Sequence, residues 1–212
     1  APHRAVRAPT IDAPERLRHP PRTPEPTTMV WRPSDGGAHA SDLASDVSDR
    51  PLAAAHYGTM VHDALDRAAR IAAPVSSIVA DLAPNLSQEE QVRVVGEVEA
   101  VLALVALQQG AVRTEVDVLG DVRWPDGSVR RVRGRIDRLH AEGDRITIID
   151  FKTDRGVPRR ASAIARYGEQ LAAYRAVLAG ASPTAQISAV LVFTSGPQMM
   201  VLDEDLPALC PA

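Results

Sequence analysis

Two neighbouring stretches constrain this chain more than any other: 134–139 reads Gly-Arg-Ile-Asp-Arg-Leu, and 146–153 reads Ile-Thr-Ile-Ile-Asp-Phe-Lys-Thr. The second is an apolar, β-branched run typical of a strand, and it ends in a carboxylate and an ammonium group. Side chains at i and i+2 of a strand share a face, so Asp150 and Lys152 should project side by side. A turn at 142–144 joins the two stretches into a hairpin and adds Asp137 to the same end. The sequence therefore predicts that three charged groups converge on one hairpin.

Lys152 is the only lysine among the 24 Lys and Arg residues of the chain. Arginine is a permanently charged fork, whereas lysine is a compact point charge whose pKa can fall on burial. A chain this rich in arginine that keeps one lysine here indicates a need for the chemistry of lysine. The alternative is a lysine that snorkels at a strand end beside surface carboxylates.

The bulk composition excludes several classes of protein. The formal charge of -3 gives no global basic field, so any nucleic-acid affinity must come from metal ions or from local arginine clusters at 130–138 and 159–160. Each cluster alone is equally compatible with a solvated face. Cys210 is the only cysteine, which excludes a disulfide framework, a cysteine-based zinc site and an iron–sulfur cluster held by this chain alone.

The chain divides at about residue 50. Residues 1–50 are rich in proline and predict an extended, partly polyproline II linker, while 51–212 predict the globular domain. Met29-Val30-Trp31 is interpreted as a short anchor onto a neighbouring domain. A chain that begins in a linker looks like the end of something larger. The lack of an apolar run of ~18 residues and of a signal-peptide core predicts a cytoplasmic protein without a membrane partner.

The coarse element order predicts an α/β fold with a hairpin-built sheet and a helical crossover. Thr59 is expected to cap a first helix that runs to about residue 71. Ser87 and Glu90 form a capping box that opens a helix to about residue 109, whose buried face includes Val92 and Val98. The remaining elements are expected to be strands at 112–122, 129–139 and 145–152, a helix at 162–178, a strand at 187–194 and an edge strand at 198–202.

The hairpin residues suit hydrolysis of a phosphodiester by a metal ion. Mg²⁺ prefers oxygen ligands and retains waters, so Asp137, Asp150 and the carbonyl of Phe151 are candidate ligands. Lys152 would lie beside the attacking water and orient it or stabilise developing charge. His62, on the first helix, can add a nitrogen ligand that also suits Mn²⁺; alternatively, it is a partly buried histidine with an ordinary partner.

Further polar residues allow both a functional and a purely structural interpretation. Glu115 is either another acid near the metal or a salt-bridge partner of the arginine-rich second strand. Tyr167, Gln170 and Tyr174 follow the i, i+3, i+7 spacing of one helix face. Gln170 and Tyr174 can hydrogen-bond a phosphate or a metal-bound water, or else Tyr174 belongs to the core and Gln170 to the surface.

Four motifs together resemble the RecB-type branch of the PD-(D/E)XK nucleases over about residues 57–202. They are Gly58-Thr59-Met60-Val61-His62, Gly134-Arg135-Ile136-Asp137, Asp150-Phe151-Lys152-Thr153 and Tyr167-x-x-Gln170-x-x-x-Tyr174. The run that follows Gln170 and the proline-rich lead-in look most like the C-terminal nuclease domain of AddA-type helicase-nucleases.

The resemblance implies a restriction-endonuclease-like core, in the order αβββαβ, with a central mixed sheet flanked by helices. It implies that His62, Asp137, Asp150 and the Phe151 carbonyl bind the metal and that Lys152 is the catalytic lysine. Gln170 and Tyr174 would support the site and contact DNA. The chain lacks a phosphate-binding loop, because that motif needs a second lysine, so a helicase motor would lie on a missing N-terminal part. The cysteine cluster of the iron–sulfur relatives, AddB-like proteins among them, is also absent.

The leading hypothesis is therefore a Mg²⁺-dependent deoxyribonuclease, an exonuclease on single strands, acting in double-strand break repair and recombination. It would work within a helicase-nuclease and beside an AddB-like subunit. The alternatives are a non-catalytic DNA-binding or scaffold module of the same fold and a stand-alone RecB-like exonuclease. The low net charge predicts poor DNA affinity for the isolated chain, since neutralised phosphates supply most non-specific binding.

Overall fold

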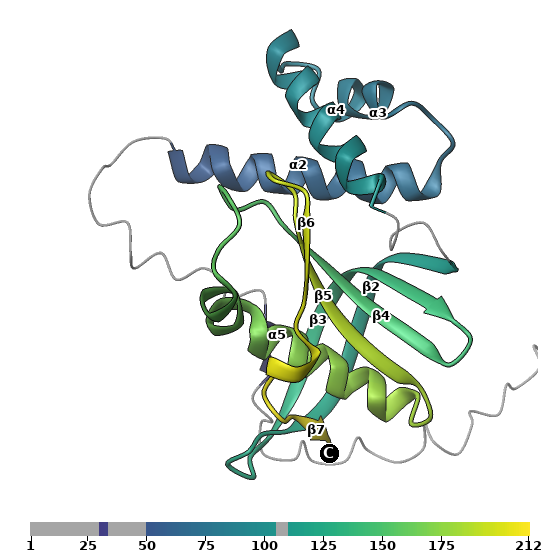
Figure 1. Ribbon diagram of the computed structural model, residues 1–212, viewed down its shortest axis with the longest axis vertical. Helices are drawn as coiled ribbons and strands as arrows, with labels where there is room; N and C mark the ends of the chain where they lie inside the picture. The colour runs from purple at the N-terminus through teal and green to yellow at the C-terminus, as the bar shows by residue number, and fades with distance from the viewer. Residues whose placement is uncertain (1–29, 34–49, 105–109) are drawn as a thin grey trace, which may run out of the picture.

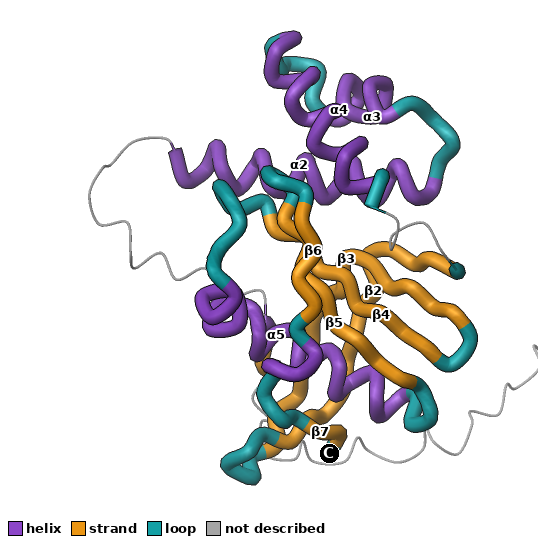
Figure 2. The backbone as a smooth tube through the Cα atoms, in the orientation of Figure 1, coloured by secondary structure: helices purple, strands orange, loops and turns teal. Residues whose placement is uncertain are grey.

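A mixed sheet with helices on both faces forms the domain, as Figures 1 and 2 show. The computed structural model describes residues 30–33, 50–104 and 110–212. The helices are α2 (Arg50–Arg70), α3 (Val75–Leu82), α4 (Gln88–Leu102), α5 (Arg160–Ala181) and the short 3-10 helix η3 (Asp203–Asp205). The strands are β1 (Val30–Trp31), β2 (Ala111–Arg123), β3 (Val129–Glu142), β4 (Arg145–Lys152), β5 (Gln186–Phe193), β6 (Gln198–Val201) and β7 (Cys210–Pro211).

The strand order is β6-β5-β4-β3-β2-β7, with β1 paired to β3. Strands β2, β3 and β4 form an antiparallel meander, as the two short turns predict. Gly127 and Gly143 take φ of 83° and 64° in those turns, a conformation that glycine adopts without strain. Strand β5 lies parallel to β4, so the chain crosses over through α5 before it returns. The predicted central mixed sheet flanked by helices is confirmed.

Helices pack against both faces of the sheet, over one face through α5 and over β4 and β5 of the other face through α2, α3 and α4. Helix α5 covers one face through a core that includes Leu171, Tyr174 and Ile148. Helices α2, α3 and α4 enclose a second core against the other face of β4 and β5, where Phe151 and Val192 point. Residues of β4 thus alternate between the two cores, which is why this strand is apolar almost throughout.

The helices differ from the sequence prediction in three ways. Helix α2 begins at Arg50, so the expected cap at Thr59 is wrong and Thr59 lies inside the helix. The capping box at Ser87 is confirmed, but α4 ends at Leu102, and the residues 105–109 expected to extend it lie outside the described residues. Val92 is 67% exposed, because α4 turns a different face to the core. The buried residues of that face are Val94, Val98 and Val101. Helix α3 was not expected.

Strand β1 pairs with β3 of the same domain, which corrects the expectation that Trp31 anchors onto a neighbouring domain. The Trp31 ring meets Trp124 edge to face at a centroid distance of 5.4 Å. Most of the predicted linker lies outside the described residues. Within the described ranges, no helix has the length and apolar character needed to cross a membrane.

Beside Asp137, the regular alternation of side chains along the β2–β3 ribbon is interrupted. Ile136 and Leu139 both contact the α5-side core, although residues of a regular strand three apart point to opposite faces. The β2–β3 register passes from Thr114↔Arg138 to Val116↔Ile136 and forms no ladder pair at the row between them. Opposite Asp137, Glu115 takes a φ of 52°, the left-handed region that costs a non-glycine residue about 1–3 kcal/mol. This distortion opens the sheet at Asp137.

Candidate active site

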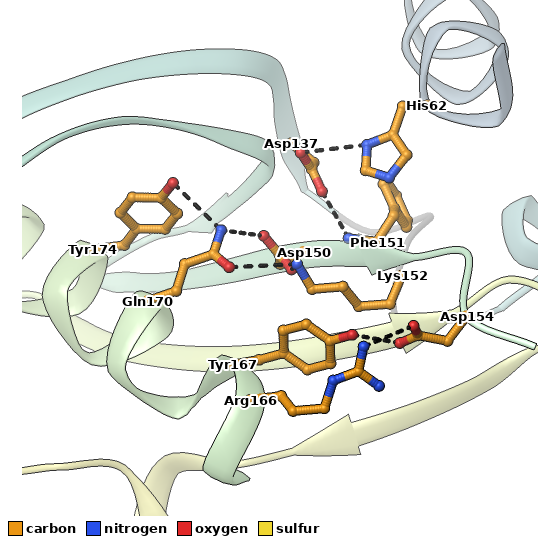
Figure 3. Close-up of polar contacts among 10 residues, drawn as sticks. All are labelled: His62, Asp137, Asp150, Phe151, Lys152, Asp154, Arg166, Tyr167, Gln170 and Tyr174. Carbon is orange, nitrogen blue, oxygen red and sulfur yellow. Dashed lines mark hydrogen bonds and ion pairs between the residues drawn. The ribbon is translucent and has the colours of Figure 1, made fainter. Parts of the chain in front are cut away.

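The two charged residues at the end of β4 form an ion pair on the α5 side of the sheet (Figure 3). Lys152 Nζ lies 2.6 Å from Asp150 Oδ2, and the Asp150 side chain is 3% exposed. The prediction that Asp150 and Lys152 project side by side from one face of the strand is confirmed. Nζ also lies 4.4 Å from the centre of the Tyr167 ring, so a cation–π contact holds the other side of the ammonium.

Asp137 reaches β4 through its side chain because the backbone ladder stops short of it. The antiparallel β3–β4 pairing begins at Arg138↔Ile149, and Asp137 Oδ2 instead accepts a hydrogen bond of 2.7 Å from the Phe151 backbone N–H. The N–H and C=O of one strand residue point to the same edge, so the Phe151 carbonyl also faces the Asp137 side. The carbonyl of the next residue, Lys152, points the other way and accepts from Thr194 N–H on the β5 side.

His62 approaches the same point from α2. Its Nδ1 lies 3.5 Å from Asp137 Oδ1, and its ring packs edge to face on Phe151 at a centroid distance of 6.0 Å. Gly58, one turn earlier, lets α2 lie close to the strand end, since a Cβ there would stand 2.9 Å from Thr153 Oγ1. The first and third sequence motifs are therefore in direct contact.

Gln170 joins the site from α5. Its amide nitrogen donates to Asp150 Oδ1 at 3.1 Å, and its amide oxygen accepts from Lys152 Nζ at 3.4 Å. The same amide nitrogen is 3.4 Å from the Tyr174 hydroxyl. Tyr174 is fully buried, so it is part of the core, whereas Gln170 points into the site and is not a surface residue.

Tyr167 connects the site to the loop after β4. Its hydroxyl donates to the Asp154 carboxylate, which also pairs with Arg166 at 3.3 Å. Asp154 was not singled out from the sequence. Its position two residues after Lys152 was the available signal, because the residue that follows a strand-end lysine at this distance can return to the same face.

Glu115 lies on the exposed margin of the site. It accepts from Arg135 Nη1 at 3.2 Å, so the described contact is the salt bridge to the second strand. Burial raises the pKa of the Glu115 carboxyl, and the nearby charge of Asp137 adds to the effect against the opposing contribution of Arg135.

Burial and mutual charge control the titration of the central groups. Burial raises the pKa of Asp150, and Asp137 raises it further against the opposing charge of Lys152. Burial acts to lower the pKa of Lys152, but the neighbouring carboxylates, chiefly Asp150, outweigh it and raise the pKa. The carboxylates around Lys152 therefore favour its charged form over the neutral amine. For His62, burial likewise lowers the pKa, but hydrogen bonding and charge from Asp137 raise it overall.

The donor set fits a hard divalent cation. Asp150 Oδ2 is buried and accepts no hydrogen bond of good geometry, although Lys152 Nζ is close. Carboxylate oxygens, a main-chain carbonyl and one imidazole are ligands that Mg²⁺ and Mn²⁺ accept. In the described part of the chain, no group of three or more His, Cys, Asp or Glu side chains is already gathered around one point as metal ligands.

Residues 38–204 match the PD-(D/E)XK nuclease superfamily, and the chain belongs to it. Members of this superfamily are in general metal-dependent nucleases. No curated protein matches the sequence. The crystal structure of SSO0001 is similar at 15% sequence identity and a TM-score of 0.36, covering 88% of this chain and 71% of that chain.

Proposed function

We propose that the chain is a divalent-metal-dependent deoxyribonuclease that hydrolyses phosphodiester bonds of single strands as an exonuclease. One observation carries the proposal: Asp137, Asp150 and Lys152 meet where β3 and β4 separate, beside His62. Superfamily membership supports a nuclease, and this cluster is the group of described residues whose chemistry suits the reaction.

Each residue has a role that follows from its contacts. Asp137, Asp150, His62 and the Phe151 carbonyl would hold the metal, which supplies charge neutralisation and an acidified water when bound. The neighbouring carboxylates favour the charged form of Lys152, whose ammonium would donate hydrogen bonds to the attacking water or to a phosphate oxygen. As the water oxygen bonds to phosphorus, the bond to the leaving alkoxide breaks; the water releases a proton to solvent, the alkoxide takes one up from solvent, and the Lys152 ammonium offsets the negative charge that develops on the phosphoryl oxygens.

The residues around Lys152 fix its position. Tyr167 holds the ammonium over its ring, and Asp154 holds the Tyr167 hydroxyl. Gln170 contacts both Asp150 and Lys152, so it keeps the pair in register with α5. Tyr174 supports Gln170 from the core. These contacts favour a catalytic site over the alternative of a non-catalytic binding module, because each charged group is positioned by a separate neighbour.

The biological setting is also a proposal. The resemblance to AddA-type proteins supports a role in double-strand break repair and recombination, with a helicase domain and an AddB-like subunit as partners in the cytoplasm. A stand-alone RecB-like exonuclease is the alternative within the same chemistry. The helicase-nuclease component and the stand-alone exonuclease can be distinguished by testing whether the purified chain degrades DNA without a motor.

The deciding experiment is degradation of single-stranded DNA by the purified chain with Mg²⁺, with Mn²⁺ and with a chelator. We expect metal-dependent cutting that Lys152→Ala and Asp150→Ala abolish. Asp144→Ala is the matched control, because Asp144 is an exposed carboxylate at the far turn of the same hairpin. Cutting that survives both site substitutions would refute the assignment. Metal-dependent cutting that Asp144→Ala also abolishes would show that the substitutions act through folding.

A further inference from the structure

An open face of the β2–β3 ribbon leads to the proposed site. In the part of the β2–β3 ribbon that α5 covers, the even-numbered residues face α5. A Cβ added at Gly120 would meet Val177, and a Cβ added at Gly134 would meet Tyr174. The odd-numbered residues therefore point away from α5. Asp117 and Arg135, on this second face, have side chains 81% and 57% exposed. We call this set the ribbon face: Asp117, Leu119, Asp121, Arg123, Val129, Arg131, Arg133 and Arg135.

The ribbon face is positively charged, although the whole chain carries a formal charge of -3. It holds four arginines and two aspartates. Arg131 is paired with Asp121 through two contacts of 2.9 Å, and Arg135 is paired with Asp117 at 3.0 Å. Arg133 stands opposite Leu119, an apolar residue that offers no acceptor. The exposed guanidinium of Arg133 therefore lies between the ion-paired guanidinium groups of Arg131 and Arg135.

The same face reaches the reactive end of the sheet. Arg135 also contacts Glu115, which stands opposite Asp137 in the β2–β3 register. Asp137 bears on His62, so it lies on the side of the sheet that faces α2, as Figure 3 shows. A nucleic-acid strand that follows the arginines along β3 therefore arrives at Asp137, where β3 and β4 separate and the Asp150–Lys152 pair approaches from the α5 side.

Charge and exposed apolar side chains favour a single-stranded nucleic acid on this face. Arginines on one face of a strand recur about every 6.8 Å, twice the rise per residue, so their guanidinium groups form a row that can pair with the phosphates of an extended strand. Leu119 and Val129 are 65% and 42% exposed, so they can contact bases that a duplex would keep stacked inside.

We propose that the ribbon face binds the sugar–phosphate backbone of the single-stranded DNA substrate and guides it to Asp137, with Arg133 as a central phosphate contact. This inference rests on the proposed function for its choice of substrate. It places most of the substrate path outside the four motifs, with Arg135 of the second motif at the end nearest the site. Arg131 and Arg135 are fixed in position by their ion pairs with Asp121 and Asp117, and Arg133 is available to bind a phosphate.

The test uses the whole chain, a fluorescently labelled oligo-dT and chelator, with anisotropy read at low salt and then across a salt series. Arg133→Glu is compared with Arg145→Glu, which makes the same charge change on an exposed residue at the far hairpin turn. We expect Arg133→Glu to weaken binding about tenfold or more, the loss of a charge-assisted contact, and to reduce the log–log salt slope by about 0.7. Arg145→Glu should bind within about twofold of wild type, because one distant charge is largely screened.

Nuclease kinetics separate this inference from the proposed function. Arg133→Glu should raise KM and keep kcat at saturating DNA, whereas Lys152→Ala should lose kcat and keep binding. Equal binding by Arg133→Glu and Arg145→Glu, duplex binding as tight as single-strand binding, or no measurable wild-type binding at low salt would each overturn the ribbon-face proposal. Full cutting by Lys152→Ala would instead overturn the proposed function, and the binding comparison would still decide the role of Arg133.

Discussion

Gly134 provides a test of how the fold supports the site. A Cβ at this position would lie 2.6 Å from Oη and 2.7 Å from Cε1 of Tyr174. The Tyr174 ring is fully buried among core residues, so it cannot move aside without disturbing them. Gly134 therefore meets a packing requirement, and Gly134→Ala should overpack the interface between β3 and α5.

The expected cost follows from two opposing effects. Overpacking a core costs about 1–3 kcal/mol, while replacing glycine by alanine in a strand returns about 0.5–1 kcal/mol through the unfolded state. Because the added Cβ would lie under 3.0 Å from Tyr174, the overpacking cost should fall in the upper part of that range, about 2–3 kcal/mol. The net loss should then be about 1–2.5 kcal/mol in the free energy of unfolding, or a fall of about 2–10 °C in Tm for a domain of this size. Urea denaturation and thermal melts of the variant measure both quantities.

Matched variants make the test specific. Gly96→Ala changes a glycine of α4 whose added Cβ would meet nothing within 4 Å, so it should stabilise by up to about 1 kcal/mol. Tyr174→Leu removes the ring atoms that clash, so the double variant should lose less than the sum of its single variants. Because Tyr174 supports Gln170, Gly134→Ala should also lower nuclease activity. Wild-type stability of Gly134→Ala would refute the packing argument.

Three further outcomes are expected. Tyr57→Phe removes a hydrogen bond to Glu97 and should cost about 1 kcal/mol after solvent screening. Burial raises the pKa of Tyr57 to about 12 from 10.0, so this wild-type advantage is complete below pH 10 and disappears as pH rises towards 12, which urea melts at several pH values measure. Lys152→Arg should fold normally yet cut at least about 100-fold more slowly in the single-strand assay, since a planar fork cannot replace a compact ammonium; wild-type cutting would contradict this. Trp31→Ala removes the edge-to-face contact with Trp124 and should destabilise by about 1–2 kcal/mol in urea, and no loss would show that β1 adds no stability.

Sequence reasoning succeeded where the determining pattern is local. The pairing of Asp150 with Lys152 needed only the two-residue period of a strand. The start of α4 followed from the Ser87–Glu90 capping box, since both partners lie within one turn. The three-strand meander followed from two glycine turns flanked by β-branched runs.

Sequence reasoning failed where distant segments decide the result. Val92 was expected to be buried, yet the contacts of α4 with its neighbours select another phase of the helix. Trp31 joins β3 across about 100 residues of chain, and the sequence pattern contains no signal for that pairing. The role of Asp154 depends on where α5 places Tyr167, which local spacing does not specify.

The sequence by itself determined the strands, the hairpin and the residues whose chemistry suits phosphodiester hydrolysis, because periodicity and turn chemistry act over a few residues. The tertiary structure decided the rest. It split the sheet at Asp137, brought His62 to that split and left Arg133 on an open face. These features depend on how α2 and α5 pack against β3 and β4, and packing between segments far apart in the chain is a property of the folded whole.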